Sequence, residues 1–509
     1  MSTSAKKRFF LSGLMLTSVA LAMRTATMLF GAFVSRTVGA EGTGVYTLIM
    51  TVYSFAVTFA TSGISLTVTR LVAAADSDSG GARPIIRGAC LYSLIFGAVA
   101  TAVLFFGAEL IGGVILADSR TVLSLKILAA SLIPVSLISV FSGYFVGVKR
   151  VSFNAAVQVL GQGVRILITV ILLLNMSKYG VVGSVTALSV ATTLTELFSF
   201  LLILAEFLVD RHRSLSKGKK GSELRRVAGA AVPLALSAYV RSAFLTVEHV
   251  MIPEKLRERG ESDSDAYAHY GTLHGMALPV ITYPMTPLTS FSGLLVPEFA
   301  SDLADGRSDR MSRIATAAVS TTLTYATAVA VFIYAFSEEL GCVLYNSQAS
   351  GYYVALLAPV IPIMYLDHVT DAMLKGIGEQ VYAMWVNITD SLLSVILVAL
   401  LIPRMGIAGY AVVIVVMEAY NFFLSFLKLR SRIRFDLHLI RSVVIPLAAS
   451  AIAVSLTSTI FAATGSMTSV PQLLLKLLFA SALTVAIISA LGALRSILQK
   501  NRQKTAYIK

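Results

Sequence analysis

The amino-acid sequence predicts an all-α integral membrane protein with fourteen transmembrane helices. Of its 509 residues, 56% are hydrophobic and 13% are charged, and the mean hydropathy is +0.80. A soluble globule of this length needs more polar surface than this composition supplies. The formal net charge of +14 does not indicate nucleic acid, because the basic residues gather in loops on one predicted membrane face.

Apolar stretches long enough to cross a bilayer recur along the whole chain. A hydrocarbon core about 30 Å thick needs about 20 apolar residues in a helix. We expect fourteen spans near residues 9–38, 45–74, 88–117, 123–148, 152–175, 180–209, 227–252, 269–299, 312–336, 352–375, 380–403, 406–430, 439–463 and 470–495.

The distribution of basic residues predicts the orientation of these spans. With the N-terminus in the cytoplasm, 29 of the 41 Lys and Arg residues fall on the cytoplasmic side and eight fall outside. This bias predicts an N-in, C-in topology. Lys6-Lys7-Arg8 and the apolar run behind it also resemble a signal peptide, but the run continues to Val38, long enough to span, so we expect it to be retained.

The spans divide into two lobes and a terminal pair. We expect an N-lobe of six helices over residues 1–209, a basic cytoplasmic linker over 210–226, and a C-lobe of six helices over 227–434. The last two helices occupy residues 435–509. Lobes with an even number of helices are parallel pseudo-repeats, and a transporter built this way binds its substrate near the midplane between them.

The first span carries an arginine near its middle, Arg24. A mid-membrane arginine costs about 3 kcal/mol on insertion scales, so it is usually retained to face a cavity, an anion or a pathway. Arg24 shares one helix face with Thr27 and several small residues. Small residues alone are also typical of close helix packing, but packing does not require an arginine. We therefore expect Arg24 and Thr27 to line water and bind substrate.

The seventh span repeats this arrangement in the second half of the chain. Ser237, Arg241 and Glu248 share one face, with Arg241 and Glu248 about 10 Å apart, too far for a direct ion pair. We predict that they line the same cavity as Arg24. His274 in the eighth span is a further substrate-binding candidate, although a lone histidine is more often a structural hydrogen-bonding residue.

The eighth span is also interrupted by prolines. A helix broken in this way is usually tolerated only where neighbours or water satisfy the freed backbone groups. We expect such partners around these positions: Pro279, Pro284, Pro287 and Pro297.

Other ionisable residues lie inside predicted spans. Arg165 and Glu196 lie at similar depth in the fifth and sixth spans, and we expect them to pair and fasten the two helices. Asp390 and Glu418 lie at similar depth in the eleventh and twelfth spans, with Asn387 beside them and no basic residue in either middle. A buried carboxylate without a base takes up a proton or binds a cation. These three residues form a candidate ion-coupling site, with simple helix packing as the alternative.

Charged residues near the membrane surfaces have simpler interpretations. Asp367, Asp371 and Lys375 follow at four-residue spacing toward the cytoplasmic end of the tenth span. They form an inner gate or a helix-end ion pair, and Arg70 at the cytoplasmic end of the second span is a further gate candidate. The charged loop between the seventh and eighth spans, around 254–265, is most simply a solvated surface.

Soluble enzyme signatures are absent from the sequence. There is no GxxxxGK[ST], HExxH or GxSxG motif, and Gly39 to Gly44 lacks the context of a dinucleotide-binding fold. We therefore expect a protein that is not an enzyme, holds no cofactor or metal, and does not use ATP.

Three segments carry a family resemblance. YGTLHGMALPVITYPMTPLTSFSGLLVPEFA (Tyr270 to Ala300), VGAEGTGVYTLIMTVYSFAVTFATSGI (Val38 to Ile64) and AVPLALSAYVR (Ala231 to Arg241) resemble the stage V sporulation protein B family of polysaccharide flippases. That family belongs to the multidrug/oligosaccharidyl-lipid/polysaccharide exporter superfamily. Arg24 matches a cavity arginine that the related lipid II flippase has on its first helix, whereas the eighth span here has no arginine.

This resemblance implies an alternating-access flippase in the bacterial cytoplasmic membrane. Its expected cargo is an undecaprenyl-pyrophosphate-linked sugar, with lipid II first, and its expected partners are this anionic lipid and membrane lipids, not nucleic acid or ATP. Na⁺ or H⁺ coupling and the membrane potential are the expected energy sources. The alternatives are another lipid-linked polysaccharide flippase, a cation-coupled multidrug exporter, or a membrane-embedded transferase with His249 as its catalytic candidate.

Overall fold

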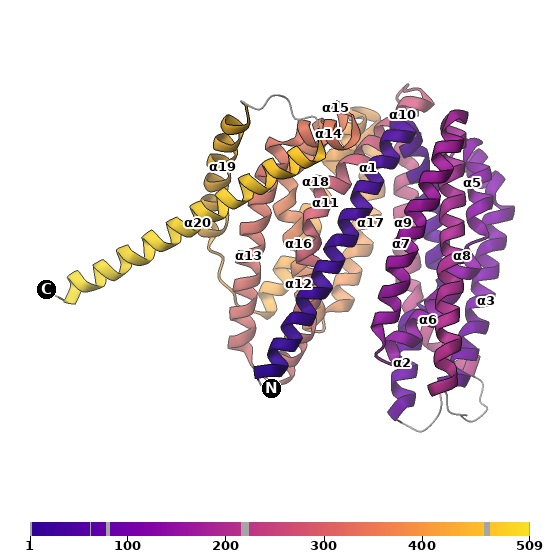
Figure 1. Ribbon diagram of the computed structural model, residues 1–509, viewed down its shortest axis with the longest axis horizontal. Helices are drawn as coiled ribbons and strands as arrows, with labels where there is room; N and C mark the ends of the chain where they lie inside the picture. Colours follow the sequence, from indigo (N-terminus) through magenta and orange to yellow (C-terminus); the bar gives the residue numbers. More distant parts are fainter. Residues whose placement is uncertain (1–2, 62, 78–81, 215–222, 463–468, 508–509) are drawn as a thin grey trace. The chain divides into compact units, whose positions relative to one another are not determined.

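The computed structural model describes the backbone of residues 3–61, 63–77, 82–214, 223–462 and 469–507. All regular secondary structure in these ranges is helical, which confirms the predicted all-α class (Figure 1). Side chains are described for residues 21–61, 63–74, 82–150, 152–210, 224–232, 235–236, 238–461 and 469–491.

Within these described ranges, twenty α-helices follow one another, with short π and 3-10 segments between some of them. The α-helices are α1 (Thr3–Thr61), α2 (Ile64–Ser77), α3 (Ala82–Phe106), α4 (Ala108–Leu110), α5 (Arg120–Ala129), α6 (Leu132–Gly147), α7 (Val151–Met176), α8 (Gly180–Ser214), α9 (Glu223–Glu258), α10 (Asp263–Tyr270), α11 (Leu278–Thr282), α12 (Thr286–Ala304), α13 (Ser308–Ala335), α14 (Ser337–Tyr345), α15 (Gln348–Leu357), α16 (Ile361–Gly376), α17 (Gln380–Met405), α18 (Ile407–Arg432), α19 (Ile445–Ala462) and α20 (Val470–Tyr507). The π segments are η1 (Ile111–Ile115), η3 (Gly271–Ala277) and η6 (Ile440–Val444), and the 3-10 segments are η2 (Ser177–Tyr179), η4 (Tyr283–Met285) and η5 (Ala358–Val360).

Nine helical stretches within the described ranges are long and apolar enough to cross a membrane, and ten if the bent pair α5–α6 is one span. Two of the nine, Leu21–Ala74 and Ser152–Asp210, contain 54 and 59 residues, so each is long enough for two crossings. The first is broken at Gly39, which has φ 79°, and the second at Gly180, which has φ 72°. The chain is therefore a multi-pass membrane protein.

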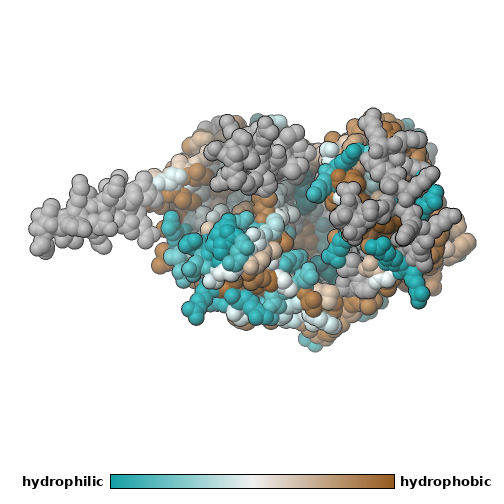
Figure 2. All heavy atoms as spheres, turned by 90° about the horizontal axis from the view of Figure 1, so that it is seen from below, coloured by the Kyte–Doolittle hydropathy of each residue, from teal (hydrophilic) through white to brown (hydrophobic). Residues whose placement is uncertain are grey.

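Large apolar side chains point away from the helix packing. Val103 in α3, Leu174 in α7 and Leu400 in α17 are all exposed. Many further large apolar side chains are exposed along the helices, as expected where a helix meets lipid. Seen from below, the molecule carries hydrophilic patches among the hydrophobic ones (Figure 2), as expected where helix ends and loops meet water.

The chain forms two compact units. The first comprises Met1–Phe33, Thr272–Asp390 and Ala411–Lys509, and the second comprises Val34–Gly271 and Ser391–Tyr410. These units follow proximity in space, whereas the expected lobes follow chain order and pseudo-symmetry. The lobe boundaries at 209, 227 and 434 therefore stay a prediction.

The second unit has its apolar core between α2, α3 and α6. The buried members of the core include Ile64 and Val68 of α2, Ala89 of α3 and Tyr144 of α6. Thr69 of α2 donates its hydroxyl to the backbone oxygen of Gly143 in α6 at 3.1 Å, so the two helices approach closely enough for a side chain to reach the neighbouring backbone.

One end of this core is closed by a buried carboxylate. Asp210 near the end of α8 is 4% exposed; it accepts a hydrogen bond from the hydroxyl of Tyr144 at 2.7 Å and forms an ion pair with Arg150. A buried charge is tolerated when it is paired and hydrogen-bonded in this way.

In the first unit, neighbouring helices satisfy the backbone of the proline-interrupted segment. Just before η4, the backbone carbonyl of Ile281 in α11 accepts a hydrogen bond from the hydroxyl of Tyr365. The carbonyl of Pro284 in η4 accepts one from the hydroxyl of Tyr325, and both distances are 2.6 Å. Thr286 bonds the carbonyl of Tyr283 at 2.6 Å. These partners confirm the expectation that neighbours would supply hydrogen bonds where the prolines break the helix.

The terminal helices α19 and α20 also belong to the first unit. Lys476 of α20 is 6% exposed and pairs with Glu339 of α14 at 2.5 Å, with its ammonium 4.6 Å from the ring centre of Phe336. A cation–π contact and an ion pair together fix this helix against α14.

Candidate functional site

Arg24 lies in the part of α1 that belongs to the first unit, and its side chain is exposed. Its neighbour Thr25 exchanges a hydrogen bond of 2.6 Å with the hydroxyl of Tyr283 in η4. The hydroxyl of Thr27 donates a hydrogen bond to the backbone carbonyl of Met23, one turn earlier in the same helix, at 2.8 Å. The structure thus sets the exposed guanidinium of Arg24 next to a contact between α1 and the broken eighth segment.

Arg241 lies in α9, in the second unit, and is also exposed. Two residues earlier, Tyr239 donates its hydroxyl to the carbonyl of Phe59 at 3.3 Å, which anchors this part of α9 to α1. The side chain of Ser237 lies outside the described side chains. Because Arg24 and Arg241 belong to different units, their predicted joint site stays a prediction.

Glu248 differs from Arg241 in its surroundings. It is 6% exposed and forms a hydrogen bond with the side chain of Tyr410, while Tyr270 lies within its electrostatic range. The neighbouring His249 bonds the hydroxyl of Tyr270 through Nδ1 at 2.8 Å. Both side chains are thus engaged inside the second unit, and the substrate-binding role of Glu248 stays a prediction.

His274 lies in the π segment η3 and is half-buried. A π turn widens the helix locally and is frequent at functional sites. The sequence does not predict this π turn, and it marks His274 only as a lone histidine in the eighth span.

Three carboxylates from three helices of the first unit lie within electrostatic range of one another. Glu418 of α18 interacts with Asp367 of α16 and Asp390 of α17, and Asp367 is hydrogen-bonded to Ser425. The second carboxylate oxygen of Asp367 is buried without a hydrogen-bond partner among the described atoms. We call Asp367, Asp390 and Glu418 the acidic cluster.

Asn387 lies one turn from Asp390 on α17. Its side-chain amide donates to the carbonyl of Ala383 at 2.7 Å. Helices α17 and α18 are joined beside Asp390, because the hydroxyl of Tyr420 donates to that of Thr389 at 3.1 Å. The structure thus joins Asp367, expected in a gate, to two of the residues expected in an ion-coupling site.

The other gate candidates do not join this cluster. Asp371 pairs with Lys375 one turn later at 2.5 Å, which is the helix-end ion pair that the sequence left as an alternative. Arg70 in α2 is exposed and belongs to the second unit. The inner gate therefore stays a prediction.

In the second unit, the structure differs from the expected pairing of Arg165 with Glu196. Arg165 of α7 and Glu196 of α8 interact electrostatically, but within the described part of the chain they form no ion pair within 4.0 Å. Arg165 instead donates to the hydroxyl of Tyr46 at 3.5 Å, and Tyr46 exchanges a hydrogen bond of 3.3 Å with Thr192. The expected direct fastening pair is thus wrong, because Tyr46 from another helix takes the place of the carboxylate.

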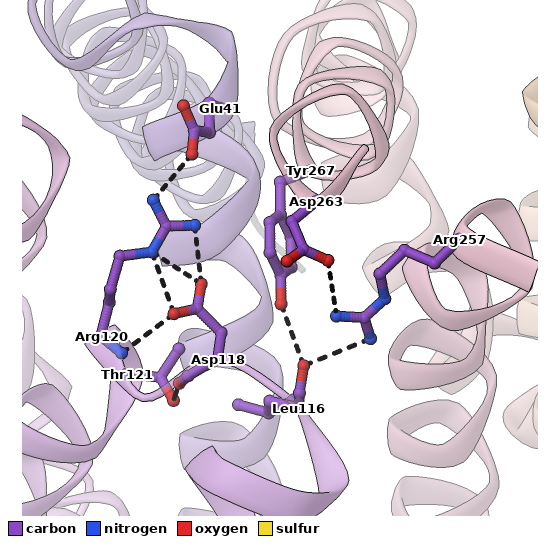
Figure 3. A network of polar contacts seen from close by, with 8 residues as sticks. All are labelled: Glu41, Leu116, Asp118, Arg120, Thr121, Arg257, Asp263 and Tyr267. Atoms are coloured by element: carbon purple, nitrogen blue, oxygen red, sulfur yellow. Dashed lines mark hydrogen bonds and ion pairs between the residues drawn. The ribbon is translucent and has the colours of Figure 1, made fainter. Parts of the chain in front are cut away.

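A second network fixes the loop that was interpreted as solvated surface (Figure 3). Arg257 near the end of α9 donates to the carbonyl of Leu116 and to Asp263, both at 3.4 Å. Tyr267 of α10 donates to the same carbonyl at 2.9 Å. Burial raises the pKa of Tyr267 to about 12, so its hydroxyl keeps the proton that it donates.

The same network extends to α1 near its break at Gly39. Arg120 pairs with Asp118 at 2.8 Å and with Glu41 at 2.7 Å, and both Arg120 and Arg257 lie within 6 Å of the ring centre of Tyr267. The interpretation of loop 254–265 as solvated is therefore wrong for Arg257, whose side chain is 18% exposed, whereas Asp263 is 68% exposed and agrees with it. Sequence alone could not indicate the network, because its members lie up to 226 positions apart.

No group of three or more His, Cys, Asp or Glu side chains within the described ranges has the geometry to hold a metal ion. The donors that come nearest to a shared site are the carboxylates of the acidic cluster. Their chemistry suits a proton or a monovalent cation better than a transition metal, which prefers nitrogen and sulfur ligands.

Comparison with known proteins gives the context for these sites. The family described as Polysaccharide biosynthesis protein matches residues 12–299, and the MatE family matches residues 274–401. The chain is 23% identical to stage V sporulation protein B of Bacillus subtilis (strain 168) over 421 residues, which is 81% of each chain. The sequence resemblance described above is thereby confirmed.

Two of the solved structures that share the fold illustrate the likeness. A lipid II flippase in an inward closed conformation superposes with a TM-score of 0.68 and 14% identity, covering 95% of this chain and all of that one. An inward-facing multidrug resistance transporter of the same superfamily has a TM-score of 0.63 and 16% identity, covering 82% of this chain and 98% of that one. At these identities the likeness establishes the fold.

Proposed function

Because the chain belongs to the polysaccharide biosynthesis protein family, we propose that it is a flippase that moves a lipid-linked saccharide from the cytoplasmic to the outer leaflet of the bacterial membrane. The substrate is an undecaprenyl-pyrophosphate-linked sugar, with lipid II as the first candidate. The protein acts by alternating access and does no chemistry on its cargo. His249, the candidate for a transferase, is engaged by Tyr270, which disfavours that alternative.

The observation that carries this proposal is the exposure of Arg24 and Arg241 inside long helices. An uncompensated mid-membrane arginine is retained for a charged ligand or pathway. A pyrophosphate matches paired guanidinium groups, because their planar forks donate charge-assisted hydrogen bonds to its oxygens. Thr27, Ser237, Glu248 and His274 are the further residues that we assign to the substrate path.

We further propose fourteen crossings with both termini in the cytoplasm. Leu21–Ala74 and Ser152–Asp210 each cross twice, α5–α6 crosses once, and α9 and the broken run α10–α12 each cross once. Helices α19 and α20 accommodate the prenyl chain.

The energy for outward movement comes from the membrane potential and from a coupling ion. Moving about two negative charges outward across a membrane with an inside-negative potential gains about 4.6 kcal/mol per 100 mV, so no ATP site is needed. We assign Na⁺ or H⁺ coupling to Asp390 and Glu418, with Asn387 and Asp367 beside them. Arg70 and Asp371 remain gate candidates.

The second candidate function is a cation-coupled drug exporter. The acidic cluster favours it, because three carboxylates in one region of the first unit attract a cation. The two exposed arginines oppose it, since they repel cationic drugs.

Translocation of fluorescent lipid II in reconstituted vesicles tests the proposal. With an inside-negative potential, Arg24→Ala and Arg241→Ala are each expected to lower the rate about 10-fold or more, because each removes a charge-assisted contact with the pyrophosphate. Lys178→Ala is the matched control, since Lys178 lies in the outer connection after α7 and contacts the ring of Tyr179.

Wild-type rates in both arginine variants would remove these residues from the site. Failure of the wild-type protein to move any lipid-linked saccharide, together with efflux of a cationic dye, would replace the flippase by the exporter.

A further inference from the structure

Helices α7 and α8 of the second unit carry opposite charges in the middle of two long apolar helices. Arg165 lies fourteen residues after the start of α7, or about 21 Å along a helix of about 39 Å. Charged side chains at such depth are costly and usually functional. The site proposed above for the pyrophosphate does not use either Arg165 or Glu196.

The register of the two helices places these charges opposite each other. A Cβ at Gly161 would lie 2.8 Å from the hydroxyl oxygen of Ser199, so α7 and α8 touch there. The helices are joined by the short segment η2 and run side by side in opposite directions (Figure 1). One turn further along α7 and one turn back along α8 lead to Arg165 and Glu196.

The two groups nevertheless leave hydrogen-bonding capacity unused. Arg165 has five N–H donors, and in the described part of the chain its one hydrogen bond is the 3.5 Å contact with Tyr46, which is long for a hydrogen bond. No described residue donates a hydrogen bond to the carboxylate of Glu196. A pair that served only to fasten two helices would close into a direct ion pair, because an open pair bears the desolvation cost without the full attraction.

Aromatic hydroxyls frame these charges. Tyr46 is held by Thr192 at 3.3 Å. About two turns further along α1, Tyr53 is 5% exposed and bonds Ser131 at 2.6 Å. Tyr53 is within electrostatic range of Tyr46, Glu196 and Arg165. The two tyrosines are thus held by hydrogen bonds, while the charged groups keep unused hydrogen-bond donors and acceptors.

A polar stripe leads along α7 to this point. Asn154, Gln158 and Arg165 lie at spacings of four and seven residues and so share one helix face, and the side chain of Gln158 is exposed. An exposed amide in an apolar span is stable where it meets water and costly where it meets lipid. The exposed amide of Gln158 therefore favours a face of α7 that meets water.

We propose that Arg165, Glu196 and Tyr46 form a contact site for the saccharide part of the transported lipid, an inference that rests on the flippase function proposed above. A sugar presents neighbouring hydroxyls that both donate and accept, and a guanidinium beside a carboxylate supplies the matching donors and acceptors. The tyrosine ring offers an amphipathic surface for the sugar face. Because the two charges cancel, the site suits a neutral polyhydroxyl group and not the pyrophosphate.

Binding of two lipids to the purified full-length protein tests this assignment. The probes are undecaprenyl pyrophosphate and lipid II, which differ in the sugar and its peptide. Arg165→Lys keeps the charge but loses the planar fork, and Glu196→Gln keeps the shape but loses the charge. Each is expected to weaken binding of lipid II about 10-fold and to leave binding of undecaprenyl pyrophosphate within 2-fold.

Two comparisons separate this role from others. Arg24→Ala is expected to weaken binding of both lipids, because it contacts the shared pyrophosphate. Asn175→Ala is the control on the same helix, since Asn175 is exposed and bonds its own helix at Ile171, and it is expected to change neither affinity.

Equal losses for both lipids in Arg165→Lys and Glu196→Gln, or wild-type affinities for both, would overturn the saccharide site while leaving the flippase intact. If the wild-type protein bound neither lipid, the flippase itself would fall, and the saccharide site with it.

Discussion

The helix pair α7–α8 and the helix pair α17–α18 both carry ionisable side chains midway along antiparallel helices, but the charges differ in sign. In α7–α8, Arg165 faces Glu196, and the local charge is balanced. In α17–α18, Asp390 and Glu418 meet a third carboxylate, Asp367, and neither helix has a basic residue in its middle. Similar positions in two expected pseudo-repeats thus hold sites of opposite chemistry.

This difference supports the occupant that we propose for each pair. A balanced pair attracts no ion, so a neutral polar group fits it best. Three carboxylates in a low dielectric repel one another until a proton or cation neutralises them. One pair is therefore suited to cargo and the other to the coupling ion.

The largest effect is expected from removing charge in α17–α18. Glu418→Gln should lower ion-driven translocation about 100-fold, because a coupling ion loses a ligand or a proton its acceptor. Translocation driven by the membrane potential alone should fall much less. Rates in vesicles with and without a Na⁺ or H⁺ gradient measure this, and equal rates under both conditions in the wild-type protein would contradict the coupling role.

A smaller effect is expected from breaking the balanced pair. Arg165→Ala leaves Glu196 half-buried without its compensating charge and should lower the free energy of unfolding by about 2 kcal/mol. The double variant with Glu196→Ala should recover most of this loss. Denaturant unfolding in detergent micelles provides the measurement, and an additive loss in the double variant would show that the two charges are not coupled.

The acidic cluster should respond to neutralisation with the opposite sign. Asp367→Asn removes one of three mutually repelling charges and should raise the free energy of unfolding by about 1 kcal/mol at neutral pH. Asp371→Asn is the control, because Asp371 is paired with Lys375 on its own helix. Destabilisation by Asp367→Asn would mean that its contact with Ser425 outweighs the repulsion.

The smallest effect concerns the connection between α16 and α17. Burial raises the pKa of Glu379, but hydrogen bonds from Lys428 and Arg432 outweigh this effect and hold the pKa below its ordinary value. The nitrogens of the two donors lie 3.3 and 2.6 Å from the carboxylate oxygens. A lowered pKa in the folded state contributes stability above the pKa of the unfolded state, and this contribution is lost as the pH falls through the folded-state pKa.

Wild-type protein should therefore exceed Glu379→Gln slightly in melting temperature at pH 7, and the difference should vanish below about pH 4. Thermal unfolding of both proteins across this range measures the effect. A difference that persisted at acid pH would mean that Glu379 stabilises the fold through the shape of its side chain and not through its charge.

Much of the molecule was predictable from the sequence because it depends on residues close together in the chain. Hydropathy over about 20 residues indicated membrane helices, and the prolines of 279–297 indicated a broken helix that needs neighbours. Arg24, Arg241, Asp390 and Glu418 stood out because a charge in an apolar run is visible without any contact.

Relations between distant residues were decided only in three dimensions. Asp367 joins Glu418, Tyr46 replaces Glu196 as the hydrogen-bond partner of Arg165, and Arg257 reaches the carbonyl of Leu116. Each relation depends on how helices rotate and slide against one another, and a rotation of one residue, or about 100°, turns a side chain to another neighbour. Helical period and hydropathy place a residue at a depth and on a face, whereas tertiary packing selects the side chain it meets.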